Sequence, residues 1–388
     1  MLDEELEGYL QLIKTDTETG KAVKIANTAF ALYRLDEKDR KTRISMIDPA
    51  SGSATKKTDV FYTDADGLMK TPEKLPLGRY LIEELQGPEG YFNDPAYSVE
   101  FEIKSDRVWQ VVGNATNDMD EYIVTEKYCN HETLGQLTIR KLGNVLTDYQ
   151  DGQFIYTQDN LAGAVYEIHA AADIATPDRQ GTCWYKSDDL VATVTTGTEG
   201  QVDEVKFSPT RTQATYDFLK ITHDGTKGEV TVTLPLGKYT VTEVKAPYGF
   251  VLTKQSYTVE FGWDNQKNDI VLAKSIVSHE QDGDKQCSYD VVNAKDASEA
   301  HKTGQILVFE NARVLPVPEQ PGDKVGKVGI GIYKQDREAM TYLQGAVYEL
   351  YTADAIYDNS GNKLLDAGAK LAESSPTNES GFTWFAVD

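Results

Sequence analysis

The sequence predicts an all-β protein built from two complete β-sandwich units in tandem and a third unit that is incomplete. Tyr, Val, Thr and Ile alternate with polar residues between clusters of Gly, Pro, Asp and Asn, a pattern typical of short strands joined by turns. No segment keeps a helical apolar period of 3.6 residues over four turns. The third observation is a long-range repeat of motifs, which determines how we divide the chain.

Three motifs recur in the same order. A strand pattern that ends in lysine comes first, as LQLIK at 10–14, LTIRK at 137–141 and IGIYK at 330–334. A strand that combines alanine with an aromatic residue follows, and its three versions read NTAFALY, LAGAVYEI and LQGAVYEL. The third motif, LPLGRY at 75–80 and LPLGKY at 234–239, begins another strand, and a proline–glycine turn follows it. We find this third motif only in the first two units.

The spacing of the repeats predicts separate domains. The recurring lysines Lys14, Lys141 and Lys334 are 127 and 193 residues apart, and such uneven spacing excludes a solenoid. The expected divisions are a first sandwich at 1–134, a second at 135–316, a Pro- and Gly-rich linker at 317–327 and a truncated third sandwich at 328–388. The second unit carries two insertions, at roughly 172–226 and 264–303.

The composition restricts the classes of function. A formal charge of −23 argues against binding to nucleic acid, whose phosphates would be repelled. There is no run of 18 or more apolar residues, so we expect no membrane-spanning helix. The three cysteines and five histidines show no metal-ligand spacing, and phosphate-binding and nucleophile motifs are absent. We therefore expect no metal, no cofactor and free thiols, with a Cys183–Cys287 disulfide as the alternative.

The lysine-ending strands place a charged residue on an apolar face. Residues two apart in a strand share a face, so the aliphatic residues of each motif point the same way as Lys14, Lys141 and Lys334. Lysine is rarely buried without a partner. The LPLG[RK]Y strands supply one, because Glu84 and Glu243 share the face of the tyrosine and aliphatic residues that precede them. Each of the first two units is therefore expected to bury a lysine and a glutamate.

The residues alone allow two interpretations of these lysine–glutamate pairs. A buried ion pair is one, although desolvation offsets much of its attraction. The other is chemical: burial keeps lysine neutral and nucleophilic, and a protonated glutamate can polarise a carboxamide and move protons. An asparagine within reach would then be attacked by the amine and would release ammonia.

The lysine strand, the Ala–aromatic strand, LPLG[RK]Y and the box YTVTEVKAPYGF together resemble the Cna B-type domains of Gram-positive surface adhesins and SpaA-type pilins. The resemblance covers nearly the whole chain. It implies transthyretin-like, inverse-immunoglobulin β-sandwiches, each with an intramolecular isopeptide bond between a first-strand lysine and a last-strand asparagine. By position, Lys14 and Lys141 would be the amines, and Glu84 and Glu243 the catalytic acids.

The asparagines are chosen by their place in each unit. Asn311, in ILVFENARV, closes the second unit and is preferred to Asn293 in YDVVNAK. Asn130, in EKYCNHETLG, precedes the next lysine strand and is preferred to Asn114 in VVGNA. Lys334 is an unpaired candidate, because the third unit stops before a matching glutamate or asparagine.

These features favour a structural surface protein, an adhesin stalk or pilin subunit locked by autocatalytic Lys–Asn bonds, rather than a turnover enzyme. The alternative is a ligand-binding adhesin module that recognises a glycan or host matrix protein through the second-unit insertions, which contain Trp184 and Trp263. We expect an extracellular, cell-wall-anchored protein whose signal and sorting sequences lie outside this fragment. Other pilin or surface subunits are the expected partners.

Overall fold

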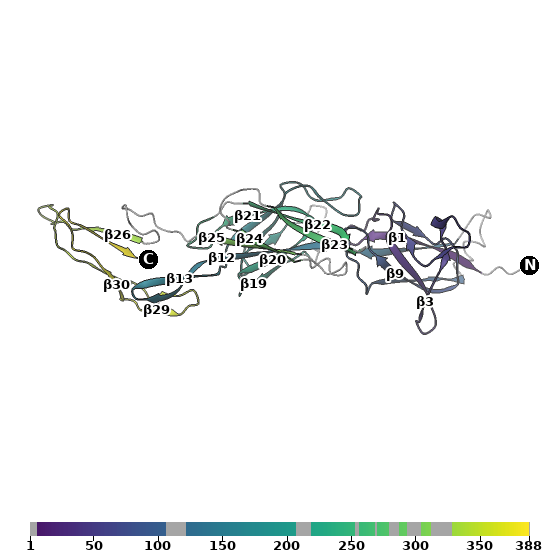
Figure 1. Ribbon diagram of the computed structural model, residues 1–388, viewed down its shortest axis with the longest axis horizontal. Helices are drawn as coiled ribbons and strands as arrows, with labels where there is room; N and C mark the ends of the chain where they lie inside the picture. The colour runs from purple at the N-terminus through teal and green to yellow at the C-terminus, as the bar shows by residue number, and fades with distance from the viewer. Residues whose placement is uncertain are drawn as a thin grey trace, which may run out of the picture.

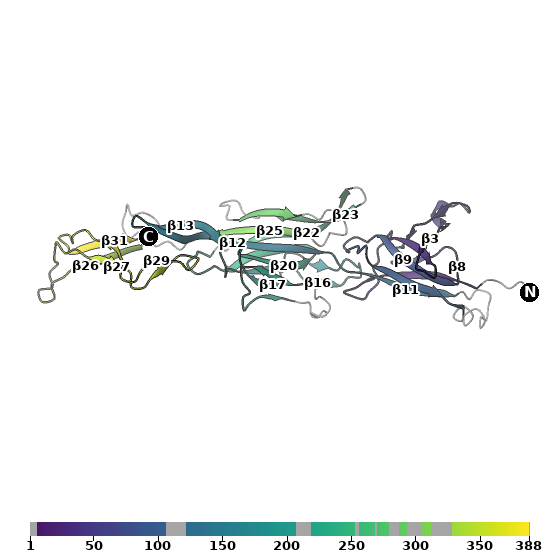
Figure 2. The ribbon, with the colours of Figure 1, turned by 90° about the horizontal axis from the view of Figure 1, so that it is seen from below.

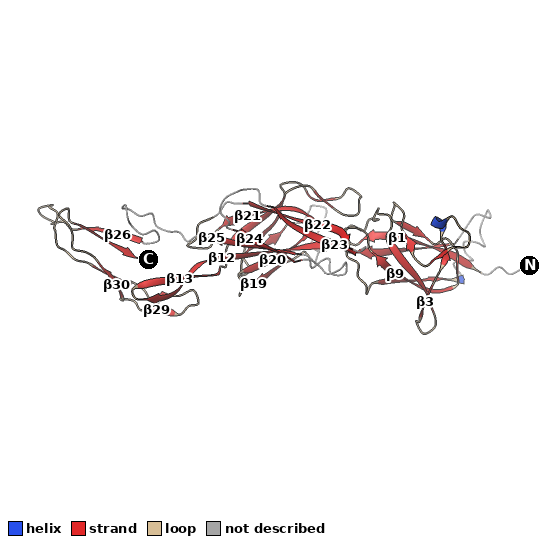
Figure 3. Cartoon of the chain, in the orientation of Figure 1, coloured by secondary structure: helices blue, strands red, loops and turns tan. Residues whose placement is uncertain are grey.

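The computed structural model describes residues 6–105, 122–206, 219–252, 256–267, 270–278, 287–292, 304–311 and 328–387. Within these residues the regular secondary structure is almost entirely β-strand with very little helix, of which the 3-10 turn η1 (Pro49–Ser51) is an example (Figure 3). The units follow one another along a single long axis in two perpendicular views (Figures 1 and 2). No helix in the described part of the chain has the length and apolar character needed to cross a membrane.

The first unit is a sandwich of two sheets. Its strands are β1 (Glu7–Asp16), β2 (Ala29–Leu35), β3 (Lys41–Arg43), β4 (Met46–Ile47), β5 (Lys57–Thr58), β6 (Phe61–Tyr62), β7 (Leu68–Lys70), β8 (Leu75–Pro76), β9 (Gly78–Gln86), β10 (Ser98–Ile103) and β11 (Ile123–Asn130). One sheet has the order β11-β1-β7, with β8 also paired to β1, and the other has the order β10-β9-β2-β3, with β6 paired to β2. Leu10 and Leu12 of the first sheet pack in one core with Phe30 and Ile82 of the second.

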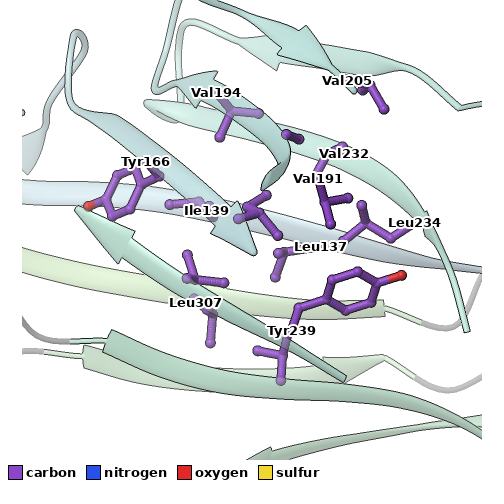
Figure 4. Close-up of a cluster of buried hydrophobic side chains, with 14 of the residues drawn as sticks. Leu137, Ile139, Tyr166, Val191, Val194, Val205, Val232, Leu234, Tyr239 and Leu307 are labelled. Carbon is purple, nitrogen blue, oxygen red and sulfur yellow. The ribbon is translucent and has the colours of Figure 1, made fainter. Parts of the chain in front are cut away.

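The second unit repeats this plan with more strands. They are β12 (Leu134–Gln150), β13 (Gln153–Asn160), β14 (Val165–Ala170), β15 (Ile174–Ala175), β16 (Cys183–Tyr185), β17 (Leu190–Thr195), β18 (Glu204–Val205), β19 (Ile221–Asp224), β20 (Glu229–Pro235), β21 (Gly237–Lys245), β22 (Ser256–Lys267), β23 (Ile270–Ser278), β24 (Cys287–Val292) and β25 (Gly304–Asn311). One sheet has the order β19-β20-β12-β25-β24 and the other β18-β17-β14-β21-β22-β23. Figure 4 shows their shared core, where Leu137 and Ile139 of one sheet meet Tyr166 and Tyr239 of the other.

The third unit is described over 328–387 as separate two-stranded pairs. Its strands are β26 (Val328–Tyr333), β27 (Glu349–Tyr351), β28 (Ile356–Tyr357), β29 (Lys363–Leu365), β30 (Lys370–Glu373) and β31 (Phe382–Val387). They pair as β26-β31, β27-β30 and β28-β29. Several large apolar side chains of this unit are exposed, namely Tyr333, Met340, Tyr342, Leu343, Val347, Tyr351 and Tyr357. The linker expected at 317–327 lies outside the described residues.

In both complete units the first and last strands are parallel neighbours. β1 pairs with β11 from Tyr9↔Ile123 to Asp16↔Asn130, and β12 pairs with β25 from Gln136↔Gly304 to Gly143↔Asn311. A pull on the two ends of such a unit would slide these two strands past one another. The site described below joins this strand pair.

Candidate functional site: two buried Lys–Glu–Asn clusters

In the first unit the structure brings together a lysine, a glutamate and an asparagine. Lys14 lies on β1, Asn130 is the last residue of the neighbouring β11, and Glu84 lies on β9 of the facing sheet. All three are buried, and Lys14 has no exposed surface. The Lys14 Nζ lies 3.8 Å from Glu84 Oε1, and Asn130 Nδ2 donates to Glu84 Oε2 at 2.5 Å. The glutamate therefore contacts both of the other side chains.

The second unit contains the same arrangement on equivalent strands. Lys141 lies on β12, Asn311 ends β25, and Glu243 lies on β21 of the facing sheet. The Lys141 Nζ lies 3.0 Å from Glu243 Oε1. Asn311 Nδ2 donates to both carboxylate oxygens of Glu243, at 2.9 and 3.1 Å. All three side chains are again buried, with Lys141 fully so.

Strand register explains why the clusters form. Each lysine lies two residues before the position that faces the asparagine, because Asp16 pairs with Asn130 and Gly143 pairs with Asn311. The side chains of these neighbouring strands therefore emerge on the core face, where alternation places every second residue. The preferred asparagines of both units thus meet the glutamates. Their rivals, Asn114 and Asn293, lie outside the described residues.

A β-bulge lies next to each glutamate and sets the direction of its side chain. In β2–β9 the register shifts between Ala29 and Phe30, so that Phe30 faces Glu84. In β14–β21 it shifts between Val165 and Tyr166, so that Tyr166 faces Glu243. Bulges commonly occur beside functional sites because the extra residue redirects a side chain.

Burial changes the protonation equilibria of the first cluster. Desolvation lowers the pKa of Lys14 to about 8, and the attraction of Glu84 only partly opposes this shift. Desolvation raises the pKa of Glu84, against the opposing effects of Lys14 and of the hydrogen bond from Asn130. Both shifts favour the uncharged forms. A neutral amine beside a protonated carboxyl group is the combination that attack on a carboxamide requires.

Comparison with known proteins places the fold. A model of the SpaA prealbumin-like fold domain matches residues 8–117 and 155–275, which is more than half of the chain. The chain belongs to this family. The comparison with curated protein sequences gives no match.

The SpaA-type chain is also similar to solved structures, at low sequence identity. The Bacillus anthracis TIE protein is 17% identical with a TM-score of 0.44, and the alignment covers 99% of this chain and 44% of that one. BcpA, the major pilin subunit of Bacillus cereus, is 15% identical (TM-score 0.27; coverage 98% and 85%). A C-terminal fragment of the pilus adhesin SpaC from Lactobacillus rhamnosus GG is 15% identical (TM-score 0.30; coverage 81% and 100%). The chain thus spans less than half the length of the TIE protein.

Aromatic rings enclose both lysines of this SpaA-type chain. Lys14 Nζ lies 5.6 Å from the ring centres of Tyr91 and Tyr128. Lys141 Nζ lies 5.9 Å from the ring centre of Tyr166 and 5.8 Å from that of Phe309. None of these rings was predicted from the sequence as part of the site. Tyr128 and Phe309 could have been found, since each stands two residues before its asparagine and so shares its face.

The insertion of the second unit contains a tryptophan that is buried rather than exposed. Trp184 is 1% exposed, and its indole Nε1 donates to Glu132 Oε2 at 2.7 Å. Glu132 belongs to the segment 131–133 that joins β11 to β12. The insertion around β15 and β16 therefore packs toward the first unit. Trp184 is not available as an exposed recognition residue.

The third lysine motif does not reproduce the site. Lys334, the unpaired candidate, is exposed. The reason is that residues 328–387 include no facing strand equivalent to β9 or β21. Among the cysteines, Cys129 and Cys183 are free thiols, which excludes the Cys183–Cys287 disulfide.

Proposed function

We propose that this chain is a structural surface protein, an adhesin stalk or pilin subunit, whose first two units are each locked by an autocatalytic isopeptide bond. The observation that carries the proposal is the duplicated cluster, in which a buried glutamate contacts both a buried lysine and an asparagine amide. Membership of the SpaA family supports it.

The reaction follows from the contacts. The neutral lysine Nζ attacks the carboxamide carbon of the asparagine, and a Cγ–Nζ bond forms as the Cγ–Nδ2 bond breaks. The protonated glutamate, which contacts the amine and the amide nitrogen, gives its proton to the departing amide nitrogen and receives the proton that the attacking amine loses, so that ammonia leaves and the carboxyl group is restored. Lys14 would join Asn130, and Lys141 would join Asn311. The reaction occurs once in each unit, without turnover or cofactor.

The topology gives these bonds a mechanical purpose. In each unit the first and last strands, β1 with β11 and β12 with β25, are parallel neighbours. Tension applied to the two ends of a unit therefore pulls these two strands in opposite directions along their length. A covalent link between the two strands carries that load past the remaining strands of the unit. It also restricts the unfolded chain, as a disulfide does. The first two units, placed in line, would form an inextensible rod.

Extracellular, cell-wall-anchored localisation and assembly with other pilin or surface subunits are parts of the same proposal. The alternative, recognition of a glycan or host matrix protein through the second-unit insertions, gains no support from Trp184, because this side chain is buried against the segment joining the units.

The direct test is the intact mass of the denatured protein. The expected result is a deficit of two ammonia masses, with peptide mapping that finds Lys14 linked to Asn130 and Lys141 linked to Asn311. A mass equal to that of the sequence would overturn the proposal. The lysines and glutamates would then be buried ion pairs.

A further inference from the structure

The short hairpin formed by β15 and β16 in the second unit ends in a tip, residues 176–182, that lies against the first unit. Gln180 Nε2 donates to Ala22 O at 2.8 Å, and Lys21 Nζ donates to Thr182 Oγ1 at 2.6 Å. The backbone N–H of Lys24 donates to Asp178 O at 3.1 Å. The tip thus follows residues 21–24 of the first unit along their length.

Residues 21–25 pack over the buried cluster of Lys14, Glu84 and Asn130. The N–H of Val23 donates to Lys14 O at 2.8 Å, so the segment folds back onto the strand that carries the lysine. Val23 and Ile25 form a small buried cluster with Tyr91, whose ring lies against Lys14 Nζ. The hairpin tip therefore packs on the outer side of residues 21–25, and the inner side of this segment packs on Tyr91, which contacts the Lys14 amine.

The hairpin tip also packs against a second segment next to the cluster, the loop at residues 87–93. A Cβ placed on Gly90 would lie 2.5 Å from Pro177 Cβ, so the proline ring packs directly on this glycine. Arg179 adds an ion pair to Glu89 at 3.2 Å. At its inner side this loop contacts the cluster, since a Cβ on Gly87 would lie 3.2 Å from Glu84 Oε2.

The contact between the hairpin tip and the first unit also buries charged side chains where the two units meet. Asp178 has no exposed surface and accepts hydrogen bonds from Thr176 Oγ1 at 2.7 Å, within the tip, and from Thr19 Oγ1 at 3.3 Å, across the joint. Glu132, in the joining segment, receives the indole N–H of Trp184. Side chains of both units are thus removed from water at one interface, a few residues from Lys14.

We propose that the hairpin tip at 176–182 seals the Lys14 centre of the first unit, so that the first isopeptide bond closes at full rate only when the second unit is docked. This proposal rests on the isopeptide function proposed above. Water that reaches the centre would stabilise the charged forms of the amine and the carboxyl group and so weaken both reactants. The Lys141 centre lies within the second unit and needs no such seal.

The test uses the full chain with residues 176–182 replaced by Asn-Gly, a two-residue turn suited to a hairpin. Ile174, Trp184 and Tyr185, which belong to the second core, are kept. The matched control replaces the exposed turn at 36–40, which lies in the first unit away from the joint, by the same two residues. Chains are made by cell-free synthesis, and ammonia loss is followed by intact mass over time, with peptide mapping to assign each bond.

We expect the Lys14–Asn130 bond to form at least about tenfold more slowly in the shortened variant. Water at the centre would let the pKa of the Lys14 amine rise toward its ordinary value, and a rise of one pH unit lowers the neutral fraction of the amine about tenfold. The Lys141–Asn311 bond and the control should keep their rates. A Lys21→Ala/Gln180→Ala variant, which removes two exposed hydrogen bonds across the joint, should slow the first bond about two- to fivefold.

The outcomes separate the two proposals. Unchanged closure of the first bond in the shortened variant overturns the seal and leaves the isopeptide function intact. Equal slowing of both bonds also overturns it, because the effect would then be a general loss of fold. An absence of ammonia loss in the unmodified chain overturns the isopeptide function and the seal together.

Discussion

The first and second units place the same three side chains on equivalent strands, yet the residue two positions after the lysine differs. In the first unit it is Asp16, whose Oδ2 accepts a hydrogen bond from Tyr91 OH at 2.7 Å. In the second it is Gly143, where a Cβ would lie 2.4 Å from a ring atom of Phe250. Tyr91 and Phe250 end the equivalent turns GPEGY and APYGF. A polar pair in one unit thus replaces a ring packed on glycine in the other.

The comparison distinguishes the side chains that the reaction needs from those that only surround the site. The lysine, the glutamate and the asparagine are common to both units, whereas their surroundings follow the neighbourhood of each unit. Asp16 and Glu18 lie with Glu132 at the joint, where their carboxylate oxygens are within 4.8 Å of one another. The first centre is therefore connected to the interface between units, and the second is enclosed by its own core. Substitutions at matching positions of the two centres would show how far they are equivalent.

The largest effect is expected from the glutamates. Glu84→Gln should abolish the Lys14–Asn130 bond and leave the other, and Glu243→Gln should do the reverse, because an amide cannot carry the proton between the nitrogens. Intact mass would then show a deficit of one ammonia in each variant and none in the double variant. Retention of both deficits would show that the glutamates are not the catalysts.

Removal of the asparagines should destabilise the two units by similar amounts. Asn130→Ala and Asn311→Ala each eliminate one cross-link between the first and last strands. By the chain-entropy relation used for disulfides, a link that closes a loop on the order of 100 residues contributes about 4–5 kcal/mol. Calorimetry of the full chain should show a lowered transition for the altered unit alone. A shift in the other unit would contradict the independence of the two locks.

The pH dependence of the unlocked first unit should reveal its buried lysine. In Asn130→Ala the amine is retained, and burial holds its pKa at about 8 in the folded chain without the bond, against an ordinary value of 10.5. Between these values the unfolded chain binds more protons, so the free energy of unfolding rises with pH, on the order of 3 kcal/mol across the window. The matched control is Lys14→Met/Asn130→Ala, which should lose this slope in denaturant titrations. Equal slopes in the two variants would show that Lys14 titrates normally.

The smallest effect is expected from the ring that differs by one hydroxyl. Tyr128 OH donates to Tyr97 O at 2.7 Å and accepts from the N–H of Glu84 at 3.2 Å, whereas Phe309 has no such group. Tyr128→Phe should lower the unfolding free energy of the unlocked first unit by about 1–2 kcal/mol, with bond formation retained. Loss of the bond in this variant would mean that the hydroxyl positions Glu84 for the reaction.

Much of the site follows from the sequence because its determinants are local. Alternation places Lys14 on the face of Leu10 and Leu12, and all three are buried in β1. The same argument holds for Glu243 with Tyr239 in β21. Repetition of the motifs then indicates that the lysine and the glutamate belong to one unit.

Other features could not be read from the chain. Alternation allows more than one asparagine per unit, and it is the parallel register of β11 with β1 that brings Asn130 to Glu84. The exposure of Lys334 cannot be read from its motif, since a strand pattern does not show whether a facing sheet covers it. Trp184, which only the alternative of a ligand-binding module required to be exposed, is buried by a contact that no local pattern encodes.

The all-β class, the repeated units and the inward face of Lys14, Lys141, Glu84 and Glu243 follow from the sequence alone, because these features depend on periodicities of a few residues. Which asparagine meets each glutamate, and how the second unit docks on the first, is visible only in the folded chain. Those contacts join residues more than 40 positions apart, such as Glu84 with Asn130 and Lys21 with Thr182, so they depend on strand register and on the packing of one unit against another.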